Sequence, residues 1–254
     1  MASQYTTILK EKMSPEGYAK LTALENEALF EFVGEAVAIG QPDSVYMCDD
    51  SDEDADYVRR RSLELGEEKN LKKNGHTIHF DGYGDQARDK ANTRFLVPAG
   101  MDLGANLNAI DRDEGLAEVK GFLSGAMKGK QAIVKLFCEG PPGSEFAIGC
   151  VQITDSCYVV HSEDILYRRG YEHFRKMEKK DEFFRFFHSA GELDERGNSK
   201  NLDKRRIYQD LVGFTVYSVN DQYAGNSVGL KKHSMRRAIY KSGKEGWLCE
   251  HMFI

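Results

Sequence analysis

Short apolar runs of strand length alternate along this chain with longer segments whose apolar residues recur at helical spacing, and this alternation limits the fold more than any other feature. The strand-length runs occupy residues 45–48, 77–80, 93–97, 132–138, 147–154, 158–161 and 211–218. The helical patterns occupy residues 21–40, 51–66, 112–127 and 163–180. A chain that mixes the two kinds of element packs helices against a sheet. We therefore predict a protein of the α/β class.

The acidic run at residues 49–56 has two interpretations. Its carboxylates could form a metal-binding loop, or they could begin a helix. The order Ser51-Asp52-Glu53-Asp54 is typical of a capping box, and acidic side chains are stabilised at the positive end of a helix. The sequence favours the start of a helix.

Charge and cysteine usage exclude several classes of protein. The formal net charge of −6 argues against binding to nucleic acid or to an anionic membrane, and the basic cluster at residues 204–206 is interpreted as a solvated face. The five cysteines lie far apart, mostly in apolar runs, as expected of reduced thiols in a reducing compartment. The first residues lack the pattern of a secretory leader, and no stretch of about 18 apolar residues occurs. We expect a cytoplasmic protein.

The stretch at residues 223–232 is a candidate anion site. Small residues at Ala224, Gly225 and Ser227 let the backbone approach a ligand and offer N–H donors, and the adjacent Lys231 and Lys232 supply positive charge. Paired lysines are also common on solvated surfaces. Both interpretations stay open on the residues alone.

Two single residues also have a functional and a structural interpretation. His251 lies among apolar neighbours, where it could be a ligand or a hydrogen-bonded core histidine. Arg88 precedes a strand-like run, where its guanidinium could hold a carboxylate in bidentate fashion or pair with Asp85 or Asp89 on the surface.

A phosphate-binding P-loop is missing from this chain. The P-loop pattern needs two glycines five positions apart, followed by Lys and then Ser or Thr. The pair Gly129-Lys130 precedes Gln131, and Gly243-Lys244 precedes Glu245. We interpret residues 121–130 as a helix end with a glycine cap. No serine or cysteine lies in a recognisable nucleophile motif, so we predict no covalent catalysis.

Seven blocks, in order along the chain, carry a resemblance to a known family. They are residues 76–83 (HTIHFDGY), 85–90 (DQARDK), 151–156 (VQITDS), 165–171 (ILYRRGY), 188–196 (HSAGELDER), 223–232 (YAGNSVGLKK) and 246–252 (GWLCEHM). From about residue 43 to residue 254 the chain resembles the GTP-dependent phosphoenolpyruvate carboxykinases, most closely their archaeal-type branch.

The resemblance implies a fold and an activity. The fold would be an α/β N-terminal domain with a mixed sheet at residues 1–218, followed at residues 219–254 by the start of the nucleotide-binding domain, without its C-terminal P-loop half. Family members are lyases that convert oxaloacetate and GTP to phosphoenolpyruvate, carbon dioxide and GDP, usually in gluconeogenesis. They use a site-bound Mn²⁺ together with GTP complexed to Mg²⁺ or Mn²⁺.

By position, the resemblance assigns four residues to the substrate. Arg88 would hold the substrate carboxylate, and Tyr223, Ala224 and Gly225 would line the substrate pocket. Ala224 departs from the family, which usually has glycine there. Its methyl group restricts positive φ and puts that substrate contact in question.

Three further residues are implied at the metal. Lys232 and His251 would be ligands of Mn²⁺, and Lys231 would stabilise developing negative charge. Lys232 can ligate a metal only as the neutral amine, and His251 only as the neutral imidazole, so the site would have to lower the pKa of that lysine.

The family's phosphate-binding loop, third metal ligand and phosphate-contacting arginines follow the segment that matches this chain. We therefore expect the chain to be inactive alone and to need the C-terminal nucleotide-binding half, in the same or another chain. A second hypothesis is a non-catalytic substrate- and metal-binding module or a subunit of a split enzyme. A third is self-association through apolar residues near Trp247 and Phe253.

Overall fold

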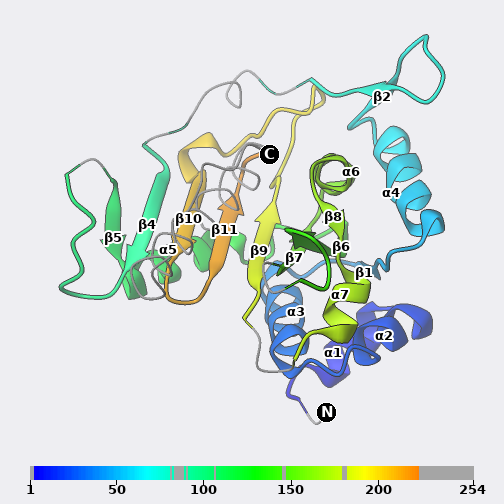
Figure 1. Ribbon diagram of the computed structural model, residues 1–254. Helices are drawn as coiled ribbons and strands as arrows, with labels where there is room; N and C mark the ends of the chain where they lie inside the picture. Colours follow the sequence, from blue (N-terminus) through cyan, green and yellow to red (C-terminus); the bar gives the residue numbers. More distant parts are fainter. Residues whose placement is uncertain are drawn as a thin grey trace.

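A nine-stranded mixed sheet organises the computed structural model, which describes residues 3–80, 82, 89, 91–105, 107–144, 147–178 and 182–222. The strand order is β1-β6-β7-β9-β11-β10-β4-β5, with β8 paired to β6 off this path. Figure 1 shows the sheet running from β5 and β4 on the left to β6 and β1 on the right. The predicted α/β class and mixed sheet are confirmed.

The elements have the following bounds. The strands of the large sheet are β1 (Ser44–Met47), β4 (Thr93–Val97), β5 (Ala109–Asp111), β6 (Gln131–Glu139), β7 (Ile148–Thr154), β8 (Arg168–Arg169), β9 (Phe184–Ser189), β10 (Arg206–Asp210) and β11 (Thr215–Val219). A two-stranded sheet pairs β2 (Lys69–Asn70) with β3 (Thr77–Ile78). The helices are α1 (Thr6–Lys12), α2 (Pro15–Thr22), α3 (Glu27–Gly40), α4 (Asp52–Glu64), α5 (Arg112–Leu123), α6 (Cys157–Leu166), α7 (Tyr171–Lys176) and the 3₁₀ turn η2 (Leu202–Lys204).

Strand directions bring six segment ends to one edge of the sheet. The strands β7, β9 and β11 are parallel, so their carboxyl ends lie together. The neighbours β6 and β10 run antiparallel to them, and β4 is parallel to β10, so these three strands begin at that same edge. We call this the polar edge: the residues that follow β7, β9 and β11 and those that precede β6, β10 and β4.

Two clusters of buried apolar residues cover the two faces of the sheet. The larger cluster joins α1, α2, α3 and α5 to one face, with Leu29, Val33 and Leu123 fully buried. The smaller cluster joins α4 and α6 to the other face through Val58 and Val160. Because alternate residues of a strand point to opposite faces, an interior strand is buried on both of them, and β6 is buried from Ala132 to Glu139, with the charged Lys135 among its apolar residues.

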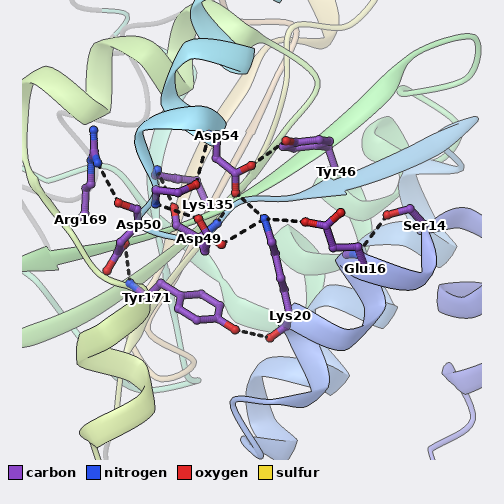
Figure 2. A network of polar contacts seen from close by, with 12 residues as sticks. Ser14, Glu16, Lys20, Tyr46, Asp49, Asp50, Asp54, Lys135, Arg169 and Tyr171 are labelled. Carbon is purple, nitrogen blue, oxygen red and sulfur yellow. Dashed lines mark hydrogen bonds and ion pairs between the residues drawn. The ribbon is translucent and has the colours of Figure 1, made fainter.

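The N-terminal helices are tied to the rest of the molecule by a cluster of partly buried charges around the buried Asp54, which we call the Lys20 network (Figure 2). Lys20 Nζ of α2 lies 2.8 Å from an Asp54 carboxylate oxygen and 3.1 Å from one of Asp49. Tyr46 Oη donates to the other oxygen of Asp54 at 2.6 Å, and Tyr171 Oη donates to the Lys20 carbonyl at 2.8 Å. The network therefore joins α2, β1, α4 and α7.

Several local predictions are confirmed. The acidic run begins a helix, since the Ser51 hydroxyl accepts from Asp54 N at 3.3 Å and α4 follows. The strand predicted at residues 93–97 is β4, and the runs at 45–48, 132–138 and 147–154 match β1, β6 and β7 within one or two residues. Capping and strand composition are local properties, so sequence alone captures them.

The prediction for residues 158–180 is wrong. The strand expected at 158–161 lies inside α6, whose first turn is capped by the Ser156 hydroxyl accepting from Val159 N at 3.3 Å. The long helix expected at 163–180 is interrupted by β8, which pairs with Phe137 and Cys138 of β6. Val159 and Val160 are β-branched, a composition typical of strands. The packing of α6 against α4 and the sheet outweighs this local preference and makes the segment helical.

Two further predictions are corrected. The helix expected at 21–40 is two helices, because Glu25 adopts φ 49° and Asn26 begins α3 by accepting from Leu29 N at 3.0 Å. The basic cluster at 204–206 is not a solvated face, since Arg205 is only 4% exposed and Arg206 begins β10. None of the helices in the described part of the chain has the length and apolar character needed to cross a bilayer.

Candidate functional site

All seven residues assigned to the site from the resemblance lie outside the described residues. They are Arg88, Tyr223, Ala224, Gly225, Lys231, Lys232 and His251. Their neighbours in sequence are described: Gly82 and Asp89 flank the stretch that contains Arg88, and Gln222 directly precedes Tyr223. All three belong to segments that reach the polar edge, so the site is described from the residues at that edge.

A buried carboxylate, Asp155, organises the segments that follow β7 and β9. Its side chain is 0% exposed and lies 2.8 Å from Lys130 Nζ, which comes just before β6. The same carboxylate accepts from Ser189 Oγ at 2.7 Å and from Ala190 N at 2.8 Å, and Lys130 also donates to Gly191 O at 2.6 Å. A buried charge is stable only when it is paired and hydrogen-bonded, and Asp155 satisfies both conditions.

A buried histidine, His188, joins β7 and β9 to the chain beyond β11. Its Nε2 lies 2.5 Å from the carbonyl oxygen of Asp221, and its Nδ1 lies 2.6 Å from the Thr154 hydroxyl. A carbonyl can only accept, so Nε2 carries a hydrogen. The Thr154 hydroxyl accepts from Ser156 N at 3.1 Å and donates to Nδ1. This bonding fixes the ring and, through Asp221, the backbone that leads to Gln222.

The residues that flank Arg88 and Tyr223 are bonded to one another. Gly82 N donates to Gln222 Oε1 at 3.0 Å, in a buried hydrogen bond between residues 140 positions apart. On the other side of the Arg88 stretch, Asp89 lies 3.8 Å from an Arg205 guanidinium nitrogen. Arg205 Nε in turn donates to Asn220 O at 3.1 Å. Gly82, Asp89 and Gln222, which flank in sequence the two segments predicted to bind substrate, are therefore tied to the same end of β11.

A cavity of about 590 Å³ opens beside the polar edge. From the polar edge, Lys130, Asp155 and Gln222 line it. The lining also includes His79, which stacks on Tyr158 with ring centroids 3.6 Å apart, and Phe80, which is 72% exposed. The lining mixes cationic, anionic and aromatic groups, a surface suited to a polar ligand.

Two adjacent glutamates near this cavity have pKa values shifted in opposite directions. Burial raises the pKa of Glu67, although Ser156 Oγ and Tyr158 N donate to its carboxylate. Burial alone would also raise the pKa of Glu68, but hydrogen bonds, chiefly with His161 and also from Thr77, outweigh it and lower the pKa to about 2. The two glutamates differ in their charged neighbours: Asp155 adds to the rise in the pKa of Glu67, whereas His161 adds to the fall in the pKa of Glu68.

Within the described ranges, no group of three or more His, Cys, Asp or Glu side chains could hold a metal ion. The predicted ligands Lys232 and His251 lie outside those ranges. The four described cysteines are free, as predicted, and burial raises the pKa of each: Cys48, Cys138, Cys150 and Cys157. Such thiols are poor nucleophiles, and of the four only Cys157 lines the cavity.

Sequence reasoning assigned no role to the four residues that build this edge: Lys130, Asp155, His188 and Gln222. A signal for two of them was present, because Asp155 and His188 lie at or just beyond the ends of apolar strand runs and inside blocks that carry the resemblance. Lys130 and Gln222 had no such signal, since their partners are 25 and 140 positions away.

Comparison with known proteins gives a consistent result. The family model described as "Phosphoenolpyruvate carboxykinase N-terminal domain" matches residues 31–243. The chain is 51% identical over 246 residues to the protein named "Phosphoenolpyruvate carboxykinase [GTP]" of Thermococcus sibiricus and 53% identical to that of Thermococcus kodakarensis, covering 97% of this chain in both cases. It is 46% identical over 92% of its length to the protein of that name from Saccharolobus solfataricus. The chain spans 37–39% of the length of these relatives.

Proposed function

The chain belongs to the phosphoenolpyruvate carboxykinase family, whose N-terminal domain it matches, and from this we propose that it supplies the substrate-binding part of a GTP-dependent phosphoenolpyruvate carboxykinase. The observation that carries the proposal is the pair of contacts from Gly82 to Gln222 and from Asp89 to Arg205. These contacts bring residues that flank Arg88 and Tyr223 in sequence to one end of β11, which supports a substrate site shared by the two segments.

In the proposed reaction, oxaloacetate and GTP give phosphoenolpyruvate, carbon dioxide and GDP. Arg88 holds a substrate carboxylate, because a guanidinium binds carboxylates in bidentate fashion. Tyr223, Ala224 and Gly225 line the substrate pocket. This is a lyase activity that would serve gluconeogenesis in the cytoplasm.

Lys232 and His251 are the proposed ligands of Mn²⁺, and Lys231 adds positive charge beside the substrate. When bound, the metal would supply charge that stabilises the negative charge left on the substrate as carbon dioxide departs. GTP, with Mg²⁺ or Mn²⁺, would bind to the C-terminal half that the longer relatives possess. We place the start of that nucleotide-binding domain at residue 219, the last residue of β11.

Turnover by the chain alone tests whether that second half is needed. With oxaloacetate, GTP and Mn²⁺, carbon dioxide release is expected at the rate of the protein-free control, because the P-loop pattern is missing from this sequence. Release that depends on the chain and is abolished by Lys232→Ala would contradict this requirement.

Binding tests the substrate site separately from turnover. Calorimetric titration with phosphoenolpyruvate and Mn²⁺ is expected to give saturable binding with a Kd on the order of 1 mM, as for a site that offers only part of its contacts. Arg88→Met should weaken this binding about tenfold or more, because a charge-assisted bidentate contact is lost. The exposed Arg60→Met is the matched control and should leave binding unchanged. A flat trace for the unaltered chain would contradict the proposed role.

A further inference from the structure

Two anchors enclose the stretch that contains Arg88. Gly82, before it, is buried and donates its amide to Gln222 Oε1, and Asp89, after it, pairs with Arg205. Gln222 lies just beyond β11, and Arg205, which directly precedes β10, donates to the carbonyl of Asn220, also just beyond β11. Gly82 and Asp89, on either side of residues 83–88 in sequence, are thus linked to the chain that leads to Tyr223, Gly82 directly and Asp89 through Arg205.

The anchors are built from side chains that are themselves buried. Gln222 is 6% exposed and Arg205 is 4% exposed. Burying an amide and a guanidinium costs free energy unless each is bonded, so their placement favours one arrangement of the chain over others. A loop that is only solvent-exposed does not require a buried amide and a buried guanidinium to hold its ends.

The backbone that carries Gln222 is fixed from the other side of the sheet edge. His188 Nε2 donates to the carbonyl of Asp221, and the Asp221 carboxylate accepts from Ser218 Oγ at 3.1 Å. The backbone next to Gln222 is therefore held by β9 and β11, independently of the contact with Gly82. A group fixed in this way can transmit the geometry of the sheet to a neighbouring segment.

We propose that Gln222, Arg205 and Asp89 are positioning residues, which fix the Arg88 stretch against the start of the Tyr223 stretch so that both reach one substrate. This inference rests on the proposed function for its substrate. None of the three residues needs to contact the substrate. They hold the binding geometry before substrate arrives. Binding then loses less conformational entropy than it would if the two stretches became ordered only in the complex.

Gln222 offers a conservative pair of variants. Gln222→Met keeps the length of the side chain and removes the acceptor for Gly82 N, whereas Gln222→Glu keeps an oxygen at that position. Exposed Gln4→Met is the control for the substitution itself. Phosphoenolpyruvate with Mn²⁺ is the probe, followed by calorimetry, and exchange of the Gly82 amide hydrogen is followed by NMR.

We expect Gln222→Met to weaken binding about tenfold, the effect of losing one hydrogen bond worth about 1.4 kcal/mol. The Gly82 amide should exchange about tenfold faster, and the thermal midpoint should stay within about 2 °C of the unaltered chain. Gln222→Glu should restore both readouts to within about threefold, which a loss of packing alone would not allow.

Asp89→Asn tests the second anchor without touching the first. Asparagine keeps an oxygen that can accept from Asn92 N, as Asp89 does at 3.1 Å, but it removes the charged oxygen that faces Arg205 and that also accepts from Asn92 Nδ2 at 2.8 Å. It should weaken binding severalfold even if Gln222→Met fails to fold. Unchanged binding in both variants, or unchanged Gly82 exchange in Gln222→Met, would overturn the inference. If the unaltered chain did not bind phosphoenolpyruvate, that result would instead contradict the proposed function. The exchange rate of the Gly82 amide in Gln222→Met would still test whether Gln222 holds Gly82.

Discussion

At the scale of single residues, the polar edge depends on buried charges that are fully bonded. Asp155 receives donors from the segments that precede β6 and follow β9, so one carboxylate holds three strand ends together. The exposed pair of Lys200 and Glu192 has the same 2.8 Å separation but lies in solvent. The two pairs have equal distances and differ in burial.

We expect Asp155→Asn to lower the free energy of unfolding by about 3 kcal/mol, because it leaves Lys130 without its buried counter-charge. Urea unfolding followed by circular dichroism measures the change. Glu192→Gln, which removes the exposed counterpart, should leave the midpoint unchanged. Equal effects of the two substitutions would show that burial does not determine the contribution of these pairs.

The lowered pKa of Glu68 predicts how the free energy of unfolding depends on pH. Its pKa falls from an ordinary 4.5 to about 2 in the folded protein. A lowered pKa means that folding favours the ionised form, so its contribution is fully present above pH 4.5 and is lost as the pH falls toward 2. Glu68→Gln should therefore cost about 2 kcal/mol at pH 7 and progressively less below pH 4.5.

Unfolding free energies at several pH values between 7 and 3 test the Glu68 prediction. The exposed Glu11→Gln serves as the control and should follow the unaltered chain over this range. A difference between Glu68→Gln and the unaltered chain that stays constant with pH would show that the carboxylate is not the titrating cause.

At the scale of elements, the turn from β8 into α7 depends on a close approach that only glycine allows. A Cβ atom on Gly170 would lie 2.4 Å from the carbonyl carbon and oxygen of Phe137, and these are backbone atoms that cannot move aside as a side chain can. Gly170 N also donates to Leu136 O at 3.0 Å. The end of α6 and the start of α7 are therefore positioned by contact with β6.

Gly170→Ala is expected to lower the free energy of unfolding by about 3 kcal/mol or more through this steric conflict. Gly121→Ala, in α5, is the matched control, because a Cβ atom there would meet nothing within 4 Å. It should raise stability by about 0.5 to 1 kcal/mol, since alanine favours a helix interior over glycine. Differential scanning calorimetry of both variants would contradict the explanation if Gly170→Ala were as stable as Gly121→Ala.

At the scale of the whole molecule, the Lys20 network connects elements that lie far apart in the sequence. Lys20 of α2 joins Asp49 and Asp54, and Asp50 in turn accepts from the backbone of Tyr171 in α7 at 2.9 Å (Figure 2). The N-terminal helices are thus part of the same folded unit as the sheet. A unit linked in this way is expected to unfold in one cooperative step.

Lys20→Met should lower the free energy of unfolding by about 3 kcal/mol, because Asp49 and Asp54 would face each other without a cation. Far-ultraviolet and near-ultraviolet circular dichroism should still report one shared transition. Lys72→Met, on the exposed surface, should leave that transition where it is. Separate transitions in Lys20→Met would indicate that α1 and α2 form an independent unit.

The sequence by itself determined the α/β class, the helix that begins at Ser51, and the strands at 93–97, 132–138 and 147–154. These features follow from capping and apolar periodicity, which act between residues close together in the chain. Family membership was also predictable, because its blocks are continuous stretches of sequence. The resemblance likewise named the candidate site residues from Arg88 to His251, which remain predictions.

Only the tertiary structure decided the rest. The end of α6, the strand β8 and the burial of Arg205 depend on contacts with β6 and with the chain beyond β11. The polar edge itself joins Lys130 to Asp155, His188 to Asp221, and Gly82 to Gln222. These partners are 25, 33 and 140 positions apart. Local propensity carries no information about pairing at such separations, since sheet order and register set it.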